Sequence, residues 1–490
     1  MLKNLLLLPL FSFFIISIIP KKNINLVKKV GLILSLLIFF YSLLILINFN
    51  INFYFMQFQY FIRYLPGIEF NIGIDGISIF FIILTTILIP ICLLVNWESV
   101  KYRYKDFTLI LFLLEFLILN IFLSLDIFFF YLFFEGVLIP MFLMIGIWGS
   151  RQRKIHAVYQ FFFYTFFGSI LMLLSFLIIY LHVGSTNIEV IKLIEFSNNR
   201  QLILWLGFFI AFAIKVPMIP FHIWLPEAHV EAPTTGSILL AGILLKLGTY
   251  GFMRFLIPLF PYATKFFTPL VILICIIGIL YGSLSTIRQI DLKKIIAYSS
   301  IVHMNFAIIG LFCNNILGYQ GSLFLMISHG IISSALFFCI GIIYDRYHTR
   351  VLYYYGGLVQ VMPIFATIFL IFILSNMGFP GTSGFIGEIL VLISIFLLNY
   401  KISLILAISM VFSAIYSIWL YNRMMFGEIK NYNKIKYNKI FYFKWFKKFS
   451  DVSKREFLIV LPLFFLNILL GIYPNLIFNV TYLSIINIFM

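Results

Sequence analysis

Apolar runs of about 20 residues recur along almost the whole chain and are separated by short polar segments. A helix of that length crosses the hydrocarbon core of a bilayer while satisfying all of its own backbone hydrogen bonds. The chain has 490 residues, of which 63% are hydrophobic and only 10% are charged, unlike a soluble domain. The pattern therefore predicts an all-α polytopic membrane protein with about 14 transmembrane helices. The expected spans lie near 2–19, 30–48, 73–95, 107–124, 126–148, 155–181, 202–229, 233–256, 268–287, 292–312, 319–344, 363–396, 403–426 and 457–485.

Most lysines and arginines lie in the connections between the expected helices, and they are concentrated in every second connection. The net charge of +17 does not indicate nucleic-acid binding, because it is not gathered on a polar domain. The positive-inside rule predicts that both termini lie outside and that the basic connections lie inside. The most basic connection, 422–456, is interpreted as a solvated loop at the membrane interface in preference to a specific lipid or partner site.

Two of the expected spans contain residues that interrupt helices. Prolines follow Lys215 inside the seventh span, and Pro380 lies among closely spaced glycines in the twelfth. Interrupted spans five helices apart are typical of transporters built from inverted repeats. We therefore expect two inverted five-helix repeats with broken helices 7 and 12. The expected organisation is an N-terminal three-helix segment 1–106, a first repeat 107–256 (helices 4–8), a second repeat 268–427 (helices 9–13), a basic inside-facing loop 428–456 and helix 14 in 457–490.

A few ionisable side chains lie within the apolar runs, where a charge costs about 2.5–3.5 kcal/mol to insert. Lys215, Lys246, Glu135 and Glu388 stand among apolar neighbours and are therefore candidate functional residues. Burial favours a neutral lysine, whereas a nearby carboxylate favours the charged form. A Glu135–Lys215 pair could therefore load or eject a proton, with Lys246 as the receiver. Glu115 fits a packing role equally well.

Two histidines, His303 and His329, lie in the tenth and eleventh spans between Lys246 and Glu388 in chain order. Histidine titrates near neutral pH, so these residues extend the predicted proton relay, although each could instead bond to a serine or a carbonyl. His222 and His229 lie beside the first break and are expected to cap freed backbone groups. Further residues near helix ends, Asp75 and Asp126, are expected to act as caps.

The chain carries no pattern typical of a resident cofactor. The cysteines are isolated and never form CxxC, which argues against a metal site, an iron–sulfur cluster or a disulfide framework. The histidines lack the paired spacing of haem ligands, and no glycine-rich nucleotide fingerprint or P-loop is present. We therefore expect no cofactor in this chain.

Several motifs are similar to those of a known family. They are KVPMIPFHIWLPEAHVEAPTTGSILLAGILLKLGTYGFMRF (215–255), STIRQIDLKKIIAYSSIVHMNFAIIG (285–310), SHGIISSALFFCIGIIYDRYHTR (328–350) and MGFPGTSGFIGEILVL (377–392). Over roughly 70–430 the chain resembles the antiporter-like membrane-arm subunits of the mitochondrial NADH dehydrogenase (respiratory complex I), which are related to Mrp-type cation/proton antiporters. Glu388 favours the subunit 4 branch, because several related subunits carry lysine at that point.

This resemblance implies roles for the candidate residues. Glu135 and Lys215 would form the charged pair of a proton channel, and Lys246 would be its central lysine. His303 and His329 would continue the hydrophilic axis. Glu388 would be the exit-side carboxylate.

The resemblance also implies a proton-translocating subunit of NADH:ubiquinone oxidoreductase in the mitochondrial inner membrane. NADH, FMN, Fe–S clusters and ubiquinone would be held by partner subunits, and the partners would be other membrane-arm subunits, lipids and protons, with no nucleic acid. The alternatives are a Na⁺/H⁺ antiporter subunit of the Mrp type, a structural scaffold without its own proton path, and a plastid relative that uses plastoquinone.

Overall fold

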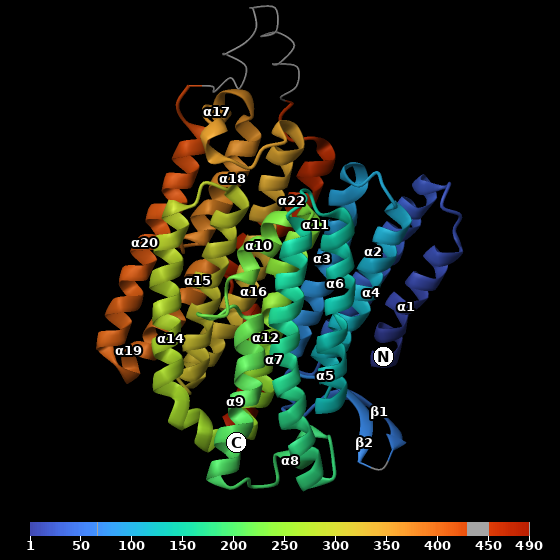
Figure 1. Ribbon diagram of the computed structural model, residues 1–490, viewed down its shortest axis with the longest axis vertical. Coiled ribbons are helices and arrows are strands. Elements are labelled where there is room, and N and C mark those ends of the chain that lie inside the picture. Colours follow the sequence, from blue (N-terminus) through green and yellow to red (C-terminus); the bar gives the residue numbers. More distant parts are fainter. Residues whose placement is uncertain (66, 429–449, 490) are drawn as a thin grey trace, which may run out of the picture.

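The computed structural model describes residues 1–65, 67–428 and 450–489 as a bundle of long, nearly parallel helices (Figure 1). Within these residues, 11 helices are long and apolar enough to cross a membrane. This confirms a polytopic α-helical membrane protein, while the count of about 14 spans stays a prediction. Four further apolar helices are shorter than a typical span, and they coincide with the expected first span, the two halves of the twelfth and part of the fourteenth.

The N-terminal third forms one side of the bundle and includes a hairpin that the sequence did not predict. Strands β1 (Gln57–Leu65) and β2 (Ile68–Ile74) pair antiparallel in the connection before α3. Helix α3 starts at Ser78, later than expected, because the Asp75 carboxylate accepts the Ser78 amide at 2.9 Å and caps the helix. The helices of this part are α1 (Leu2–Ile18), α2 (Ile24–Ile47), α3 (Ser78–Ser99), α4 (Tyr104–Leu123), α5 (Ile127–Gly136), α6 (Leu138–Trp148), α7 (Lys154–Val183) and α8 (Ile188–Ile191).

The central part of the chain contains the first broken helix and one of the two most deeply buried spans. Helix α9 (Asn198–Lys215) ends at Lys215, and the chain resumes as a helix only at α10 (Trp224–Glu231). Almost every residue of the following apolar helix, Thr234–Leu259, is buried within the bundle. Its consecutive parts are α11 (Thr234–Leu239), η1 (Leu240–Leu244), α12 (Leu245–Gly251), η2 (Phe252–Leu256) and α13 (Ile257–Leu259), of which η1 and η2 are π-helical turns on either side of α12.

The last part contains the second break, between α18 (Pro363–Asn376) and α19 (Ser383–Leu398). Both interruptions lie where prolines and glycines predicted them, but the structure does not test the inverted-repeat relation or the proposed domain boundaries. The remaining helices are α14 (Pro261–Arg288), α15 (Leu292–Phe312), α16 (Ile316–Tyr347), η3 (Leu352–Tyr354), α17 (Leu358–Val361), α20 (Tyr400–Met425), α22 (Lys454–Ile472) and α23 (Asn475–Phe489).

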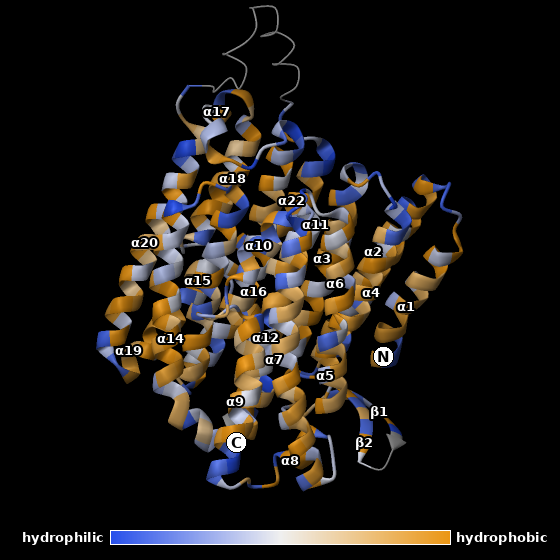
Figure 2. Ribbon diagram, in the orientation of Figure 1, coloured by the Kyte–Doolittle hydropathy of each residue, from blue (hydrophilic) through white to orange (hydrophobic). Residues whose placement is uncertain are grey.

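Hydrophilic residues lie at both ends of the bundle and are more abundant at the end that carries α17 and the start of α22, whereas the sides are mostly apolar (Figure 2). Both chain ends lie toward the other end, near α8 and the hairpin (Figure 1). This arrangement agrees with the predicted topology, in which the termini share the side opposite the basic connections. We call the end with α17 the basic end. Of the basic connection 422–456, residues 429–449 lie outside the described residues.

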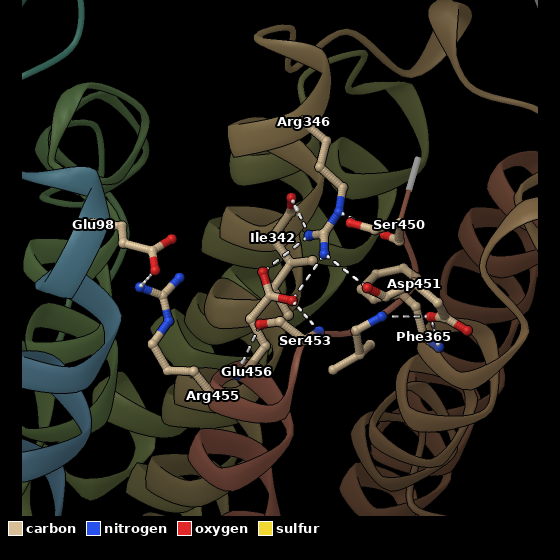
Figure 3. Close-up of polar contacts among 10 residues, drawn as sticks. Glu98, Ile342, Arg346, Phe365, Ser450, Asp451, Ser453, Arg455 and Glu456 are labelled. Carbon is tan, nitrogen blue, oxygen red and sulfur yellow. Dashed lines mark hydrogen bonds and ion pairs between the residues drawn. The ribbon is translucent and has the colours of Figure 1, made fainter. Parts of the chain in front are cut away.

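A group of ion pairs and hydrogen bonds joins the start of α22 to three other helices (Figure 3). The Arg346 guanidinium, near the end of α16, binds both carboxylate oxygens of Glu456 at 2.8 and 3.1 Å. The Asp451 carboxylate accepts the first amides of α18, and Arg455 pairs with Glu98 of α3 at 3.1 Å. Residues 450–456, expected to belong to a solvated loop, therefore hold α22 against α16, α18 and α3.

We expect Arg346→Met to lower the free energy of unfolding by about 2–3 kcal/mol, because the buried Glu456 carboxylate loses a bidentate, charge-assisted partner. Denaturant titration of the purified protein in detergent measures this change. The double variant Arg346→Met/Glu456→Gln should cost less than the sum of the two single variants. Simple additivity would show that the pair contributes no coupling energy.

Candidate functional site

Four of the six predicted site residues form a continuous row through the core. Lys246 on α12 contacts His329 on α16, with 2.8 Å between Nζ and Nδ1. The rings of His329 and His303 have centroids 5.7 Å apart, and His303 Nδ1 on α15 lies 3.0 Å from Glu388 Oε1 on α19. None of the four residues is more than 6% exposed. We call Lys246, His329, His303 and Glu388 the central row.

The contacts at the two ends of the central row, Lys246–His329 and His303–Glu388, are suited to passing a proton. A charged Lys246 donates to His329 Nδ1, whereas a neutral Lys246 can accept a proton from the same nitrogen. Lys246 Nζ also donates to the carbonyl of Ala241, which orients the ammonium group within the π-helical part of its helix. His303 and Glu388 can exchange a proton directly across their contact.

A small cavity adjoins the far end of the central row. Its volume is about 10 Å³, and its lining includes His303, His329, Glu388, Ser328 and Asn376. This space is close to that needed for a single water molecule among polar groups. The other ring nitrogen of His303, Nε2, and the other carboxyl oxygen of Glu388, Oε2, are buried and have no hydrogen-bond partner among the described residues. The cavity therefore provides a place where a proton carrier could connect these atoms.

The second break places the chain directly against Glu388. Gly378 has a φ of +72° and lies so close to Glu388 Oε2 that a side chain at position 378 would collide with the carboxylate. The left-handed backbone favours glycine at this position, and any larger residue would also displace the Glu388 carboxylate. The interruption of the twelfth span thus shapes the environment of the candidate carboxylate.

The other two predicted residues, Glu135 and Lys215, lie near each other but form no direct ion pair in the described structure. Glu135 on α5 accepts a hydrogen bond from Ser169 on α7 at 2.7 Å. Lys215, the last residue of α9, is 4% exposed, and its Nζ lies 4.7 Å from the centre of the Phe134 ring. The two charges are within electrostatic reach of each other. The predicted Glu135–Lys215 pair therefore interacts electrostatically without direct contact, and the Phe134 ring lies beside the lysine.

Close helix packing connects this pair to the central row. A side chain at Gly248 would collide with Val216 and would lie 3.1 Å from Lys215 Cβ. Helices α9 and α12 therefore pack closely beside Lys215 at Gly248, which lies two residues along the chain from Lys246. No hydrogen bond between described side chains joins the two lysines. Coupling between them must therefore act through their electrostatic field or through solvent.

The histidines beside the first break differ in their surroundings. The His222 ring bonds to the carbonyl of Pro220, within the unwound segment. His229 is fully buried and stacked on Phe337 with ring centroids 4.6 Å apart. Neither ring nitrogen of His229 has a hydrogen-bond partner in the part of the chain that is described, so His229 does not cap the break.

The sequence analysis missed a buried charged cluster at the basic end. Lys293 donates to the carbonyl of Ala232 at 2.7 Å, and Arg350, which is 1% exposed, donates to Val230 and approaches Glu231 at 3.5 Å. These residues flank helix ends, where charge is expected to be solvated, so no pattern distinguished them. His229 lies within electrostatic reach of both Lys293 and Lys246. The cluster therefore extends the polar interior from the central row toward the basic end.

An open hollow of about 410 Å³ reaches this cluster. Lys293, Asp345, Asn96 and Thr234 are among its lining residues. Nearby, burial raises the pKa of the Asp291 carboxyl, an effect partly opposed by the Arg350 guanidinium. The hollow gives the buried cluster access to the solvent of the basic end.

The remaining acidic residues have mixed roles. Asp75 caps α3 and also accepts a hydrogen bond from Arg254 at 2.8 Å, so its expected capping role is only part of its function. Asp126 caps α5 by accepting the amides of Phe128 and Phe129, as predicted. Glu115 is fully buried, and neither of its carboxyl oxygens has a partner among the described residues, which leaves its role open.

Comparisons with known proteins agree on a single family. A protein-family model described as "NADH:quinone oxidoreductase/Mrp antiporter, TM" matches residues 124–416 of the sequence. NADH-ubiquinone oxidoreductase chain 4 of Chondrus crispus is 52% identical to this chain over 98% of it and 96% of the relative. The chain 4 proteins of Marchantia polymorpha and Arabidopsis thaliana are 52% and 50% identical, each over 99% of this chain and 96% of the relative.

Solved structures share the same fold. A chain of respiratory complex I from Thermus thermophilus with bound NADH superposes with a TM-score of 0.87 and 27% identity, covering 100% of this chain and 99% of that one. A chain of an archaeal membrane-bound sulfane sulfur reductase superposes with a TM-score of 0.83, covering 96% of this chain and 75% of that one. Its sequence identity is 23%, so this likeness supports the fold alone. The chain therefore belongs to the NADH-ubiquinone oxidoreductase chain 4 family of antiporter-like membrane proteins.

Proposed function

We propose that the chain is a proton-translocating membrane-arm subunit of NADH:ubiquinone oxidoreductase in the mitochondrial inner membrane. The single observation that best supports a path of its own is the central row, in which ionisable groups from four helices contact one another inside an apolar bundle. Buried charges are expensive in such surroundings, so a row of them favours transport over a purely structural role. Its partners are the other subunits of the membrane arm and the surrounding lipids.

Electron transfer belongs to the partner subunits in this proposal. NADH, FMN, Fe–S clusters and ubiquinone would be bound there, and this chain would respond to quinone reduction at a distance. Among the described residues, no group of three or more histidine, cysteine or acidic side chains could hold a metal ion. The side chains of the central row supply proton binding and transfer, which needs no resident cofactor.

Electrostatic coupling from the Glu135–Lys215 pair can drive the proton along the row. Moving one charge against 100 mV costs about 2.3 kcal/mol. Two unit charges 4 Å apart interact by about 4 kcal/mol at an effective dielectric constant of 20. A change in the distance between Glu135 and Lys215 therefore involves enough energy to bias the protonation of Lys246, whose helix packs against α9 beside Lys215. The proton would then pass by way of His329 and His303 to Glu388.

Proton pumping by the assembled complex tests this proposal at the Glu135–Lys215 pair. We expect Lys215→Ala and Glu135→Ala each to lower coupled proton transfer about 100-fold, because either change removes the charge that biases Lys246. NADH-driven acidification by sealed membrane vesicles measures the effect. Full pumping stoichiometry in a normally assembled variant would count heavily against the relay. Sodium-dependent exchange without NADH would instead favour an antiporter.

A further inference from the structure

A second, larger hollow lies at the basic end, away from the central row. It has a volume of about 1010 Å³ and is formed by the start of α2 and the end of α3. Lys22, Lys28 and Lys101 line it together with Trp97, and Glu98 is the one acidic residue among its described lining. Glu98 is itself paired with Arg455 at 3.1 Å. The hollow is therefore a basic site, which we call the α2–α3 hollow.

The structure holds one of these lysines in place. Lys28 donates to the carbonyl of Trp97, and its Nζ lies 5.6 Å from the Trp97 ring and 5.1 Å from the Tyr104 ring. Lys22 and Lys101 are exposed, and neither forms an ion pair with a described residue. By contrast, the neighbouring Lys105 is occupied, because it donates to the carbonyls of Ser17 and Ile19 at 2.6 and 2.7 Å. The hollow thus presents positive charge that the protein itself does not neutralise.

An apolar stripe begins at the edge of the α2–α3 hollow and runs along α2. Leu26 lines the hollow and is 46% exposed. Ile33, Leu37, Phe40 and Leu44 continue along the helix at spacings of three and four residues, which place them on one face, and each is more than half exposed. Helix α2 is long and apolar enough to cross a membrane. A basic hollow at the membrane surface is therefore continuous with an apolar surface at membrane depth.

We propose that the α2–α3 hollow binds the headgroup of an anionic phospholipid, whose acyl chains lie along the exposed stripe of α2. The phosphate accepts hydrogen bonds from the lysine ammonium groups, and Trp97 lies at the depth where aromatic side chains favour the headgroup region. Basic pockets between membrane helices are suited to such headgroups. A free phosphate ion would use the lysines but not the stripe. The proposal does not depend on proton translocation.

Photocrosslinking in the intact membrane complex tests this site. A phosphatidylglycerol with a photoreactive acyl chain is incorporated into vesicles that contain the complex, and crosslinked peptides are mapped. We expect crosslinks within 24–47, competed by unlabelled phosphatidylglycerol but not by phosphatidylcholine or inorganic phosphate. Lys22→Gln/Lys101→Gln should lower the yield of these crosslinks about 30-fold, since each basic residue near an anionic surface contributes about fivefold to binding. Both lysines are exposed, so the double variant is expected to fold.

The matched control removes two exposed arginines of the basic end that do not line the α2–α3 hollow, Arg153 and Arg423. Arg153→Gln/Arg423→Gln should leave the crosslinks and their competition unchanged. Equal competition by phosphatidylcholine, or an unchanged response in Lys22→Gln/Lys101→Gln, would overturn the proposal. Absence of probe crosslinks within 24–47 would overturn it as well, because the stripe would then not be open to acyl chains.

Discussion

Lys246→Met is expected to lower coupled proton transfer through this chain about 100-fold or more. Lys246 is fully buried and is the group through which α12 contacts the histidine pair, at 2.8 Å from His329 Nδ1. Methionine has a similar length and is apolar, so it fills the space without a group that can carry a proton. NADH-driven proton release into sealed vesicles, divided by NADH oxidised, measures the loss.

Two further variants separate proton transfer from a requirement for charge. Lys246→Arg keeps the positive charge, but a guanidinium group is not deprotonated in proteins, so we expect pumping to be lost here too. Full pumping by this arginine variant would show that Lys246 acts as a fixed charge and does not carry the proton. Lys154→Met is the matched control, because Lys154 lies at the basic end and donates only to the carbonyl of Ile147 in the described structure. It should pump normally.

The bundle could be predicted from hydropathy, and its candidate residues from ionisable side chains that lie within apolar runs. An apolar run of sufficient length has few alternatives to a membrane helix, and a lysine or glutamate inside it must find polar surroundings. These arguments led to Lys246, His329, His303 and Glu388. The two interruptions followed from proline and glycine, which remove or weaken helical hydrogen bonds.

Other features depend on how each helix is rotated about its axis, which hydropathy does not determine. Glu135 bonds to Ser169 and not to Lys215, because the rotation of α5 turns its carboxylate toward α7. Similarly, the expected capping role of His229 failed, since its ring stacks on Phe337 in the interior. Arg350 looked like a solvated charge at a helix end but is buried by the chain that folds over it. Such contacts arise from packing between segments distant in sequence.

The Glu388→Gln variant should also lower coupled proton transfer about 100-fold, and for a different reason. Glutamine has the same shape and can keep a hydrogen bond to His303 Nδ1, but it cannot bind and release a proton. The row would therefore stay in place while its last carrier is lost. Redox-difference infrared spectra of the complex should lose a carboxylic-acid C=O band in this variant, a change that a purely structural role would not produce.

Control variants show whether the geometry or the carboxyl group of residue 388 matters. Glu388→Asp keeps the acid but shortens the side chain by one methylene, so the 3.0 Å contact to His303 must lengthen and pumping should be only partly retained. Glu195→Gln removes an exposed carboxylate and should have no effect. If Glu388→Gln pumped fully, the proton would have to leave His303 by another route. The unpartnered His303 Nε2 beside the small cavity is the atom from which that route would start.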